Sequence, residues 1–150
     1  MEKKDLKPAG VFKYFEEICQ VPRPSKKEEK MIAYLKAFGA KHNLETKVDE
    51  AGNVLFKKPA TPGKENLQTV VLQSHIDMVC EKNNDVQHDF LTDPIETEID
   101  GEWLKAKGTT LGADNGIGVA TELAILADDS IEHGPLECLF TVDEETGLTG

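Results

Sequence analysis

Residues 69–79 read TVVLQSHIDMV, and this stretch decides the fold and locates the candidate chemistry. Its first half is an almost continuous apolar run, which is typical of a central strand buried on both faces of a sheet. His75 and Asp77 follow at the end of the run, two positions apart. Because alternate residues of a strand share a face, the imidazole and the carboxylate are presented together where the strand ends. This arrangement suits a metal-bound histidine that is held by a neighbouring acid.

Segments with helical and strand patterns alternate along the rest of the chain. Amphipathic periodicity and a capping-box pattern, SKKE at residues 25–28, predict helices at residues 9–20, from 25 onward and at 115–127. Apolar alternation and turn residues predict strands at 44–48, 54–57, 69–74, 95–99, 102–107 and 136–142. The pair Asp100-Gly101 is expected to be the hairpin turn between two of them. We therefore predict an α/β fold with a mostly parallel central sheet sandwiched by helices.

Two acidic clusters follow the first buried strand, GADNG at residues 112–116 and DEETG at residues 143–147. Because the carboxyl ends of parallel strands meet at one edge of a sheet, we expect His75, Asp114 and the Glu144-Glu145 pair at a common rim. Each has a simpler interpretation. His75 is compatible with a structural role, Asp114 with capping the next helix, and the glutamates with a solvated turn. Adjacent carboxylates at the end of a buried strand nevertheless repel each other unless a cation or a proton lies between them.

The glycines around Asp114 also suggest a phosphate-binding loop, but the spacing matches neither the dinucleotide fingerprint nor the Walker pattern. An acid in the middle of such a loop would repel phosphate.

Composition narrows the function classes. The 150 residues carry a formal net charge of -11, which disfavours nucleic acid and anionic membranes as partners and is compatible with a cation site. The three cysteines lack a metal-binding spacing, so we expect free thiols in a reducing compartment. The first residues contain no secretory signal, and no apolar run approaches the ~20 residues that cross a bilayer. We therefore expect a cytoplasmic protein.

Three blocks of sequence carry a resemblance to a known family. They are SHIDMV at 74–79, GTTLGADNGIG at 108–118 and DEETGLTG at 143–150. Together they resemble the aminoacyl-histidine dipeptidases, also called Xaa-His or carnosinase-like cytosolic dipeptidases, which are co-catalytic zinc peptidases. The resemblance implies metal-dependent hydrolysis of dipeptides. The alternatives are a tripeptide aminopeptidase or amide deacylase of the same superfamily, or a fragment that binds metal or protein without catalysis.

The resemblance also implies a role for each candidate residue. His75 is expected to bind one zinc ion, Asp114 to bridge two zinc ions, and Glu145 to bind the second. Mn²⁺ and Co²⁺ share these ligands. Asp77 is expected to orient the ring of His75, and Glu144 to be the general base. Spacing alone does not say which glutamate of the pair is the ligand. The peptide bond after the bridging aspartate is expected to be cis.

The family pattern is incomplete in this chain. Its site needs two further ligands, an aspartate soon after the glutamate pair and a late histidine, and residues 1–150 contain neither. The lid and dimerisation domain of the family is absent as well. We therefore expect residues 1–150 to be the N-terminal portion of a zinc-peptidase catalytic domain, from a full-length protein that is a homodimer. Alone, this portion is expected to bind zinc weakly and to hydrolyse little.

Overall fold

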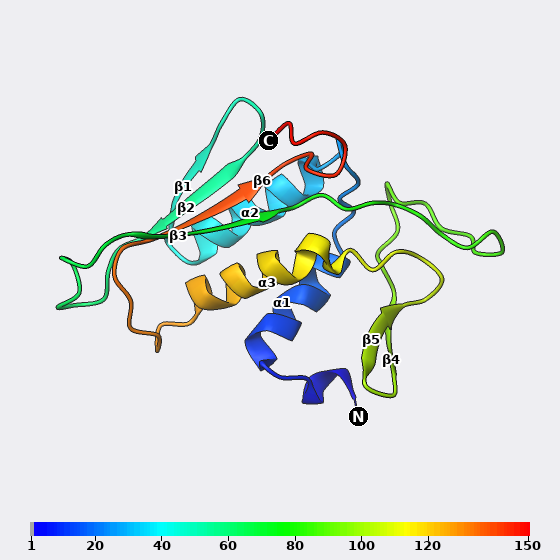
Figure 1. Ribbon diagram of the computed structural model, residues 1–150, viewed down its shortest axis with the longest axis horizontal. Helices are drawn as coiled ribbons and strands as arrows, with labels where there is room; N and C mark the ends of the chain where they lie inside the picture. Colours follow the sequence, from blue (N-terminus) through cyan, green and yellow to red (C-terminus); the bar gives the residue numbers. More distant parts are fainter. Residues whose placement is uncertain (1) are drawn as a thin grey trace.

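A four-stranded sheet forms the centre of the computed structural model, which describes residues 2–150 (Figure 1). The strands lie in the order β1-β2-β6-β3 and span Glu45–Val48 (β1), Val54–Lys58 (β2), Val70–His75 (β3) and Leu136–Thr141 (β6). A separate hairpin consists of β4, Thr97–Asp100, and β5, Trp103–Ala106. The helices are η1, a 3₁₀ turn at Lys3–Asp5, then α1 at Ala9–Cys19, α2 at Glu29–Lys41 and α3 at Ala113–Ala127. The predicted α/β class is confirmed.

The sheet is mixed. β3 runs parallel to β6, as expected for the two strands that precede the candidate site. β2 is antiparallel to both β1 and β6, so the expectation of a mostly parallel sheet is wrong for these residues. The short turn at residues 49–53 explains the β1–β2 pair, because a connection of this length can join only antiparallel neighbours.

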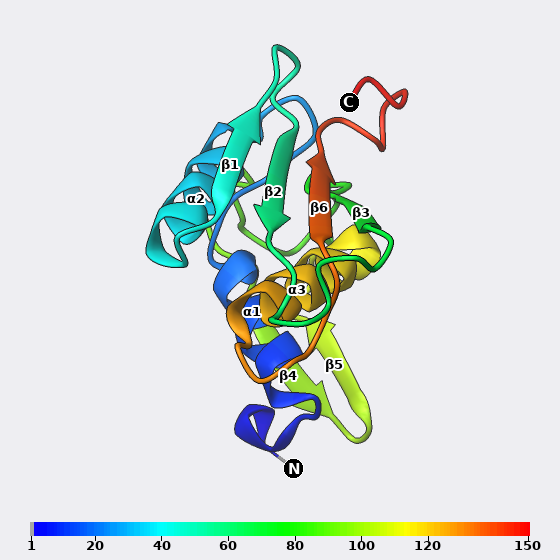
Figure 2. The ribbon, with the colours of Figure 1, turned by 90° about the vertical axis from the view of Figure 1, so that its left-hand side faces the viewer.

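The helices cover one face of this sheet (Figures 1 and 2). Phe56 and Cys138 are register partners on that face, and both are fully buried. Phe38 of α2 packs 5.8 Å from the ring of Phe56, and α3 lies over Cys138. The alternate residues of β6, such as Leu139, are only partly buried. Within residues 2–150 the helices thus form a single layer, and the predicted sandwich is wrong for this part of the chain.

β3 lies at the edge of the sheet and β6 at its centre, which reverses the expectation for the apolar run of residues 69–74. Val70 and Val71 are 53% and 57% exposed, whereas Ser74 and His75 are buried. The carboxyl-terminal end of β3 is therefore covered, whereas its amino-terminal end is exposed. An apolar run alone does not distinguish a strand at the edge of a sheet from one at its centre.

The β4–β5 hairpin is present, but its turn falls one residue later than predicted. Asp100 pairs with Trp103, so Gly101 and Glu102 form the loop. Gly101 takes the first loop position with a φ of +61°, which glycine adopts without a steric penalty.

The three cysteines are free thiols, as expected. Cys19 and Cys138 are buried, and burial raises the pKa of the Cys19 thiol to about 12, so it is a protonated packing group. In the part of the chain that the structure describes, no helix has the length and apolar character needed to cross a bilayer.

Candidate metal centre

The ends of β3 and β6 lie side by side and bring the acidic clusters to His75. His75 is the last residue of β3 and pairs with Thr141 of β6, so the segment after β6 begins beside it. Nε2 of His75 lies 3.0 Å from Oδ1 of Asp114 and 3.8 Å from Oε2 of Glu144. Ligand atoms of His75, Asp114 and Glu145 all lie within 4.8 Å of one another. The structure therefore brings together the three residues expected to bind metal, with Glu144 next to them.

Asp77 is fully buried and joins the ends of the two strands. Its Oδ1 accepts a hydrogen bond from the backbone N–H of Glu144 (3.1 Å) and lies 3.2 Å from Nδ1 of His75. Its Oδ2 accepts hydrogen bonds from the Ser25 hydroxyl (2.6 Å) and the backbone N–H of Glu145 (3.2 Å). Burial raises the pKa of the Asp77 carboxyl, but these hydrogen bonds and the nearby imidazole outweigh it and hold the pKa below its ordinary value. An ionised Asp77 accepts Nδ1–H of His75, which leaves the Nε2 lone pair available to a cation.

Asp114 does not cap α3, because Asn115 does. Both residues have non-helical φ and ψ at the start of α3, and the peptide bond between them is cis, which confirms that expectation. Oδ1 of Asn115 accepts a hydrogen bond from the N–H of Gly118 (3.2 Å), in the manner of an N-cap residue. The Asp114 side chain is 88% exposed, and its Oδ1 faces His75. The capping interpretation of Asp114 is thus wrong, and its carboxylate is free to face the cluster.

Ser25 and Glu28 do not form the expected capping box. α2 begins after Glu28, and no side-chain hydrogen bond caps it. The Ser25 hydroxyl bonds Asp77 instead, and Oε1 of Glu28 accepts the backbone N–H of Asp143 at 2.8 Å. Glu28, Asp77 and Asp143 form a buried group of carboxylates next to the candidate ligands. Sequence reasoning noticed these residue types but missed their role, because their partners lie about 50 and 115 positions away.

The cluster fits a divalent transition-metal ion. The 3.0 Å between the His75 and Asp114 ligand atoms approaches the ~3.3 Å that separates two ligands of a tetrahedral zinc with bonds of ~2.0–2.1 Å. Imidazole and carboxylate ligands suit zinc, manganese and cobalt alike. A cavity of about 540 Å³, lined by His75, Asp114, Asn115 and Glu144 among others, opens beside the cluster. Its volume is in the range of small-ligand sites.

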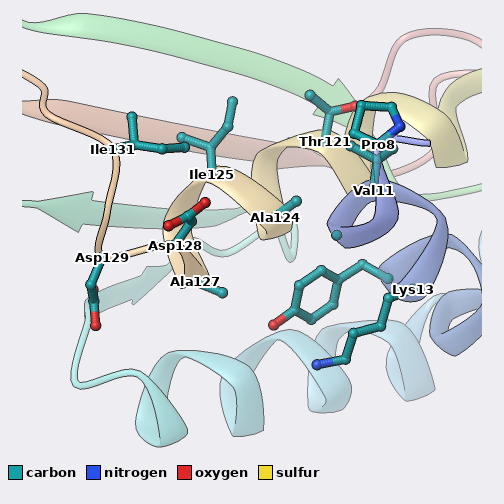
Figure 3. Close-up of a pocket in the computed structure, with 12 residues that line it drawn as sticks. Pro8, Val11, Lys13, Thr121, Ala124, Ile125, Ala127, Asp128, Asp129 and Ile131 are labelled. Carbon is teal, nitrogen blue, oxygen red and sulfur yellow. The ribbon is translucent and has the colours of Figure 1, made fainter.

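A second cavity, of about 490 Å³, lies between α1 and the end of α3 (Figure 3). Its wall is formed mainly by Val11, Ala124, Ile125 and other apolar residues. Lys13 and Tyr14 also line it, and Nζ of Lys13 lies 5.1 Å from the centre of the Tyr14 ring. No histidine lines it, and the metal-type clusters among the described residues lie elsewhere. The chemistry-bearing groups thus converge on the first cavity.

This fold and this site define an α/β protein with an imidazole–carboxylate cluster beyond the carboxyl ends of two parallel strands. The model of peptidase family M20/M25/M40 matches residues 71–150, the part of the chain that holds all the candidate ligands. The chain belongs to this family.

Three relatives that match most or all of the chain are peptidases by name. The chain is 51% identical over 149 residues to the cytosol non-specific dipeptidase of Escherichia coli K12. The match covers 99% of this chain and 31% of that protein. It is 54% identical to aminoacylhistidine dipeptidase from Vibrio alginolyticus, with a TM-score of 0.97 over all of this chain and 31% of that one. Aminopeptidase PepT from Bacillus cereus is 25% identical, with a TM-score of 0.75 over 92% of this chain and 37% of that one. The chain thus spans about a third of the length of these relatives.

Proposed function

We propose that this chain is part of a metal-dependent peptidase that hydrolyses dipeptides, of the Xaa-His type among others. The observation that carries the proposal is the convergence of His75, Asp114 and Glu145, residues from three distant segments, within 4.8 Å of one another. The dipeptidase names of the E. coli and V. alginolyticus relatives support the substrate class. Membership of a peptidase family supports the reaction class.

In this proposal His75, Asp114 and Glu145 would hold two divalent cations, with the Asp114 carboxylate as the shared ligand. Zn²⁺ is the first candidate, and Mn²⁺ and Co²⁺ suit the same ligands. When bound, such ions polarise a carbonyl group and lower the pKa of a bound water toward ~7. Asp77 keeps the proton of His75 on Nδ1, so that Nε2 faces the cluster.

Glu144 is the general base. Its carboxylate lies 3.8 Å from the His75 ring, at the wall of the cavity, and it is partly exposed rather than buried. The carboxylate accepts a proton from the attacking water and returns it to the leaving amine nitrogen of the substrate. The backbone N–H of Glu144 is held by Asp77, so the same buried acid positions both the imidazole and the base.

Residues 1–150 are, in this proposal, the N-terminal portion of a longer catalytic domain. The coverage of about a third of the relatives supports it, as does the open edge of β3 with its exposed Val70 and Val71. The remaining metal ligands and a dimerisation domain would come from the rest of the protein, which would be a homodimer. This portion alone would bind zinc weakly and hydrolyse little. The name of the E. coli relative supports a cytoplasmic location.

The substitution Glu144→Gln tests the function in the complete gene product. We expect the variant to keep its zinc content and to lose about 10²–10⁴-fold in turnover of an Xaa-His dipeptide, because the proton acceptor is removed while the ligands stay. Glu132→Gln, which removes an exposed glutamate elsewhere, is the control. Zinc binding without measurable turnover in the wild type would favour a binding module, and undiminished turnover in the Glu144 variant would rule out Glu144 as the base. Faster turnover of tripeptides than of dipeptides by the wild type would favour an aminopeptidase such as the B. cereus relative.

A further inference from the structure

Arg23 is a buried cation that contacts two of the three segments carrying the candidate ligands, those of His75 and Asp114. It lies in the link between α1 and α2 and is 2% exposed. Its carbonyl oxygen accepts the N–H of Met78 at 3.1 Å, and Pro24 forms a bridge with Met78, so the link is docked along the segment after β3. The side chain then reaches across to the start of α3.

The guanidinium joins the two segments through main-chain carbonyls. Nη1 donates to the carbonyl oxygens of Ile76 (3.0 Å) and Asp77 (3.3 Å), directly after His75. Nη2 donates to the carbonyl oxygen of Gly112 (2.6 Å), two residues before Asp114. A guanidinium is a rigid planar fork, so two carbonyls bound to different nitrogens are held at a fixed separation.

Two glycines make room for this fork. A Cβ atom on Gly112 would lie 2.6 Å from Nη2 of Arg23, and one on Gly116 would lie 2.7 Å from it. Gly112 also has a φ of +71°, and its carbonyl oxygen accepts the N–H of Gly116 at 3.0 Å. The start of α3 is therefore shaped around the guanidinium.

Stability alone is a poor explanation for this arrangement. The acceptors that the structure gives to Arg23 are carbonyl oxygens, and burial lowers the pKa of its guanidinium although the nearby charge of Asp77 raises it. Burying a charge without an ionic partner is costly, and a cation beside the amino end of a helix opposes the helix dipole. An apolar side chain would fill the same space at lower cost. What an apolar side chain lacks is the pair of fixed hydrogen bonds.

We propose that Arg23 is a positioning residue that sets the distance between His75 and Asp114 and thereby the affinity of the site for divalent cations. The inference rests on the proposed metal centre. The guanidinium of Arg23 connects Ile76, the residue after His75, to Gly112 in the turn before Asp114. Nε2 of His75 and Oδ1 of Asp114 lie 3.0 Å apart. Arg23 touches neither the cavity nor the ligand atoms, so its effect passes through the backbone.

The test compares Arg23→Lys with Lys58→Met in the complete gene product. Lys58 is the matched control because it also donates to main-chain carbonyls, those of Leu126 in α3 (2.9 Å) and of Asp128, the C-cap residue of that helix (3.5 Å). The zinc dissociation constant is measured by competition with a chromophoric chelator, and the melting temperature of the metal-free protein is measured alongside. The visible spectrum of the cobalt-loaded protein reports coordination geometry.

Arg23→Lys is expected to weaken zinc binding by roughly 10–100-fold and to change the cobalt spectrum, because lysine keeps the charge but not the fork. Lys58→Met is expected to lower the melting temperature with an unchanged zinc dissociation constant. A lower melting temperature with unchanged zinc affinity in Arg23→Lys would overturn the inference and leave the proposed function standing. A wild-type protein that binds no divalent cation would overturn the proposed function itself.

Gly116→Ala decides the matter if Arg23→Lys does not fold. The added methyl group would displace Nη2 of Arg23, while the protein keeps the arginine and its charge. Weaker zinc binding in this variant supports the positioning role, and unchanged binding contradicts it.

Discussion

The chemistry of His75 depends on which ring nitrogen carries the proton. Asp77 is buried, accepts hydrogen bonds from Ser25 and from two backbone N–H groups, and has a depressed pKa, so it presents an ionised acceptor to Nδ1. The other nitrogen faces Asp114. The pattern of His75 and Asp77 two residues apart predicted this pairing, because alternate residues of a strand share a face.

Asp77→Asn should weaken zinc binding by about 10–100-fold, because an amide neither fixes the His75 tautomer nor strengthens the ring as a ligand. The measurement is zinc affinity by chelator competition. Asp100→Asn, which removes a carboxylate of the surface hairpin, is the control for the change in net charge. Identical affinities in the wild type and both variants would mean that Asp77 serves only the fold.

Glu122 is a buried carboxyl of α3 that the proposed mechanism does not use. Burial raises its pKa from 4.5 to about 7, and the nearby hydroxyl of Ser74 and thiol of Cys138 only partly offset the effect. The folded protein holds the proton of Glu122 more tightly than the unfolded chain does. The stabilisation that protonated Glu122 gives the folded state is therefore fully present below pH about 4.5, and it is lost progressively as the pH rises to about 7.

Glu122→Gln should therefore stabilise the protein at pH 8 by up to about 3 kcal/mol relative to wild type, and by little near pH 4.5. Urea unfolding of both proteins across this pH range gives the difference. A difference that does not change with pH would show that Glu122 titrates normally in the folded protein.

Among the elements, the start of α3 is the most constrained. Asn115 caps the helix by accepting the N–H of Gly118, and a Cβ on Gly118 would lie 2.2 Å from that acceptor oxygen and 3.1 Å from Cβ of Ser74. The glycine thus allows α3 to pack against β3 while Asp114 turns toward His75.

Gly118→Ala should lower the free energy of unfolding by about 1–3 kcal/mol and weaken metal binding, because the cap and the packing against β3 must shift together. Gly10→Ala in α1 is the control, since its Cβ would meet only Cβ of Ala124 at an ordinary 3.5 Å. The control is expected to be neutral or slightly stabilising. Equal stability of both variants would show that the start of α3 tolerates a side chain at this position.

The elements were predictable from sequence to within a few residues, and the pattern of their contacts was not. Periodicity located α1, α3, β3 and β6, and it placed Asp114 and the glutamates near the ends of these elements. The SKKE pattern failed as a capping box because Ser25 and Glu28 find partners at the site. A local rule considers only neighbours in the sequence, so it misses a hydrogen bond made across the fold.

Across residues 2–150, the site lies at one rim of a sheet that the helices cover on one face. The ligand candidates reach this rim from β3, from the segment after β6 and from the start of α3. The buried carboxyl of Asp77 and the guanidinium of Arg23 link these segments from within. The class of the fold followed from the alternation of elements. The covered face and the edge position of β3 did not, because apolar runs do not reveal which strand will be the neighbour.

The most direct test is anomalous diffraction at the zinc edge from crystals of the complete gene product grown with zinc. The account predicts two peaks, one within bonding distance of Nε2 of His75 and the other of Glu145, with Asp114 touching both. Ordered density for these three residues with zinc bound only elsewhere would contradict it.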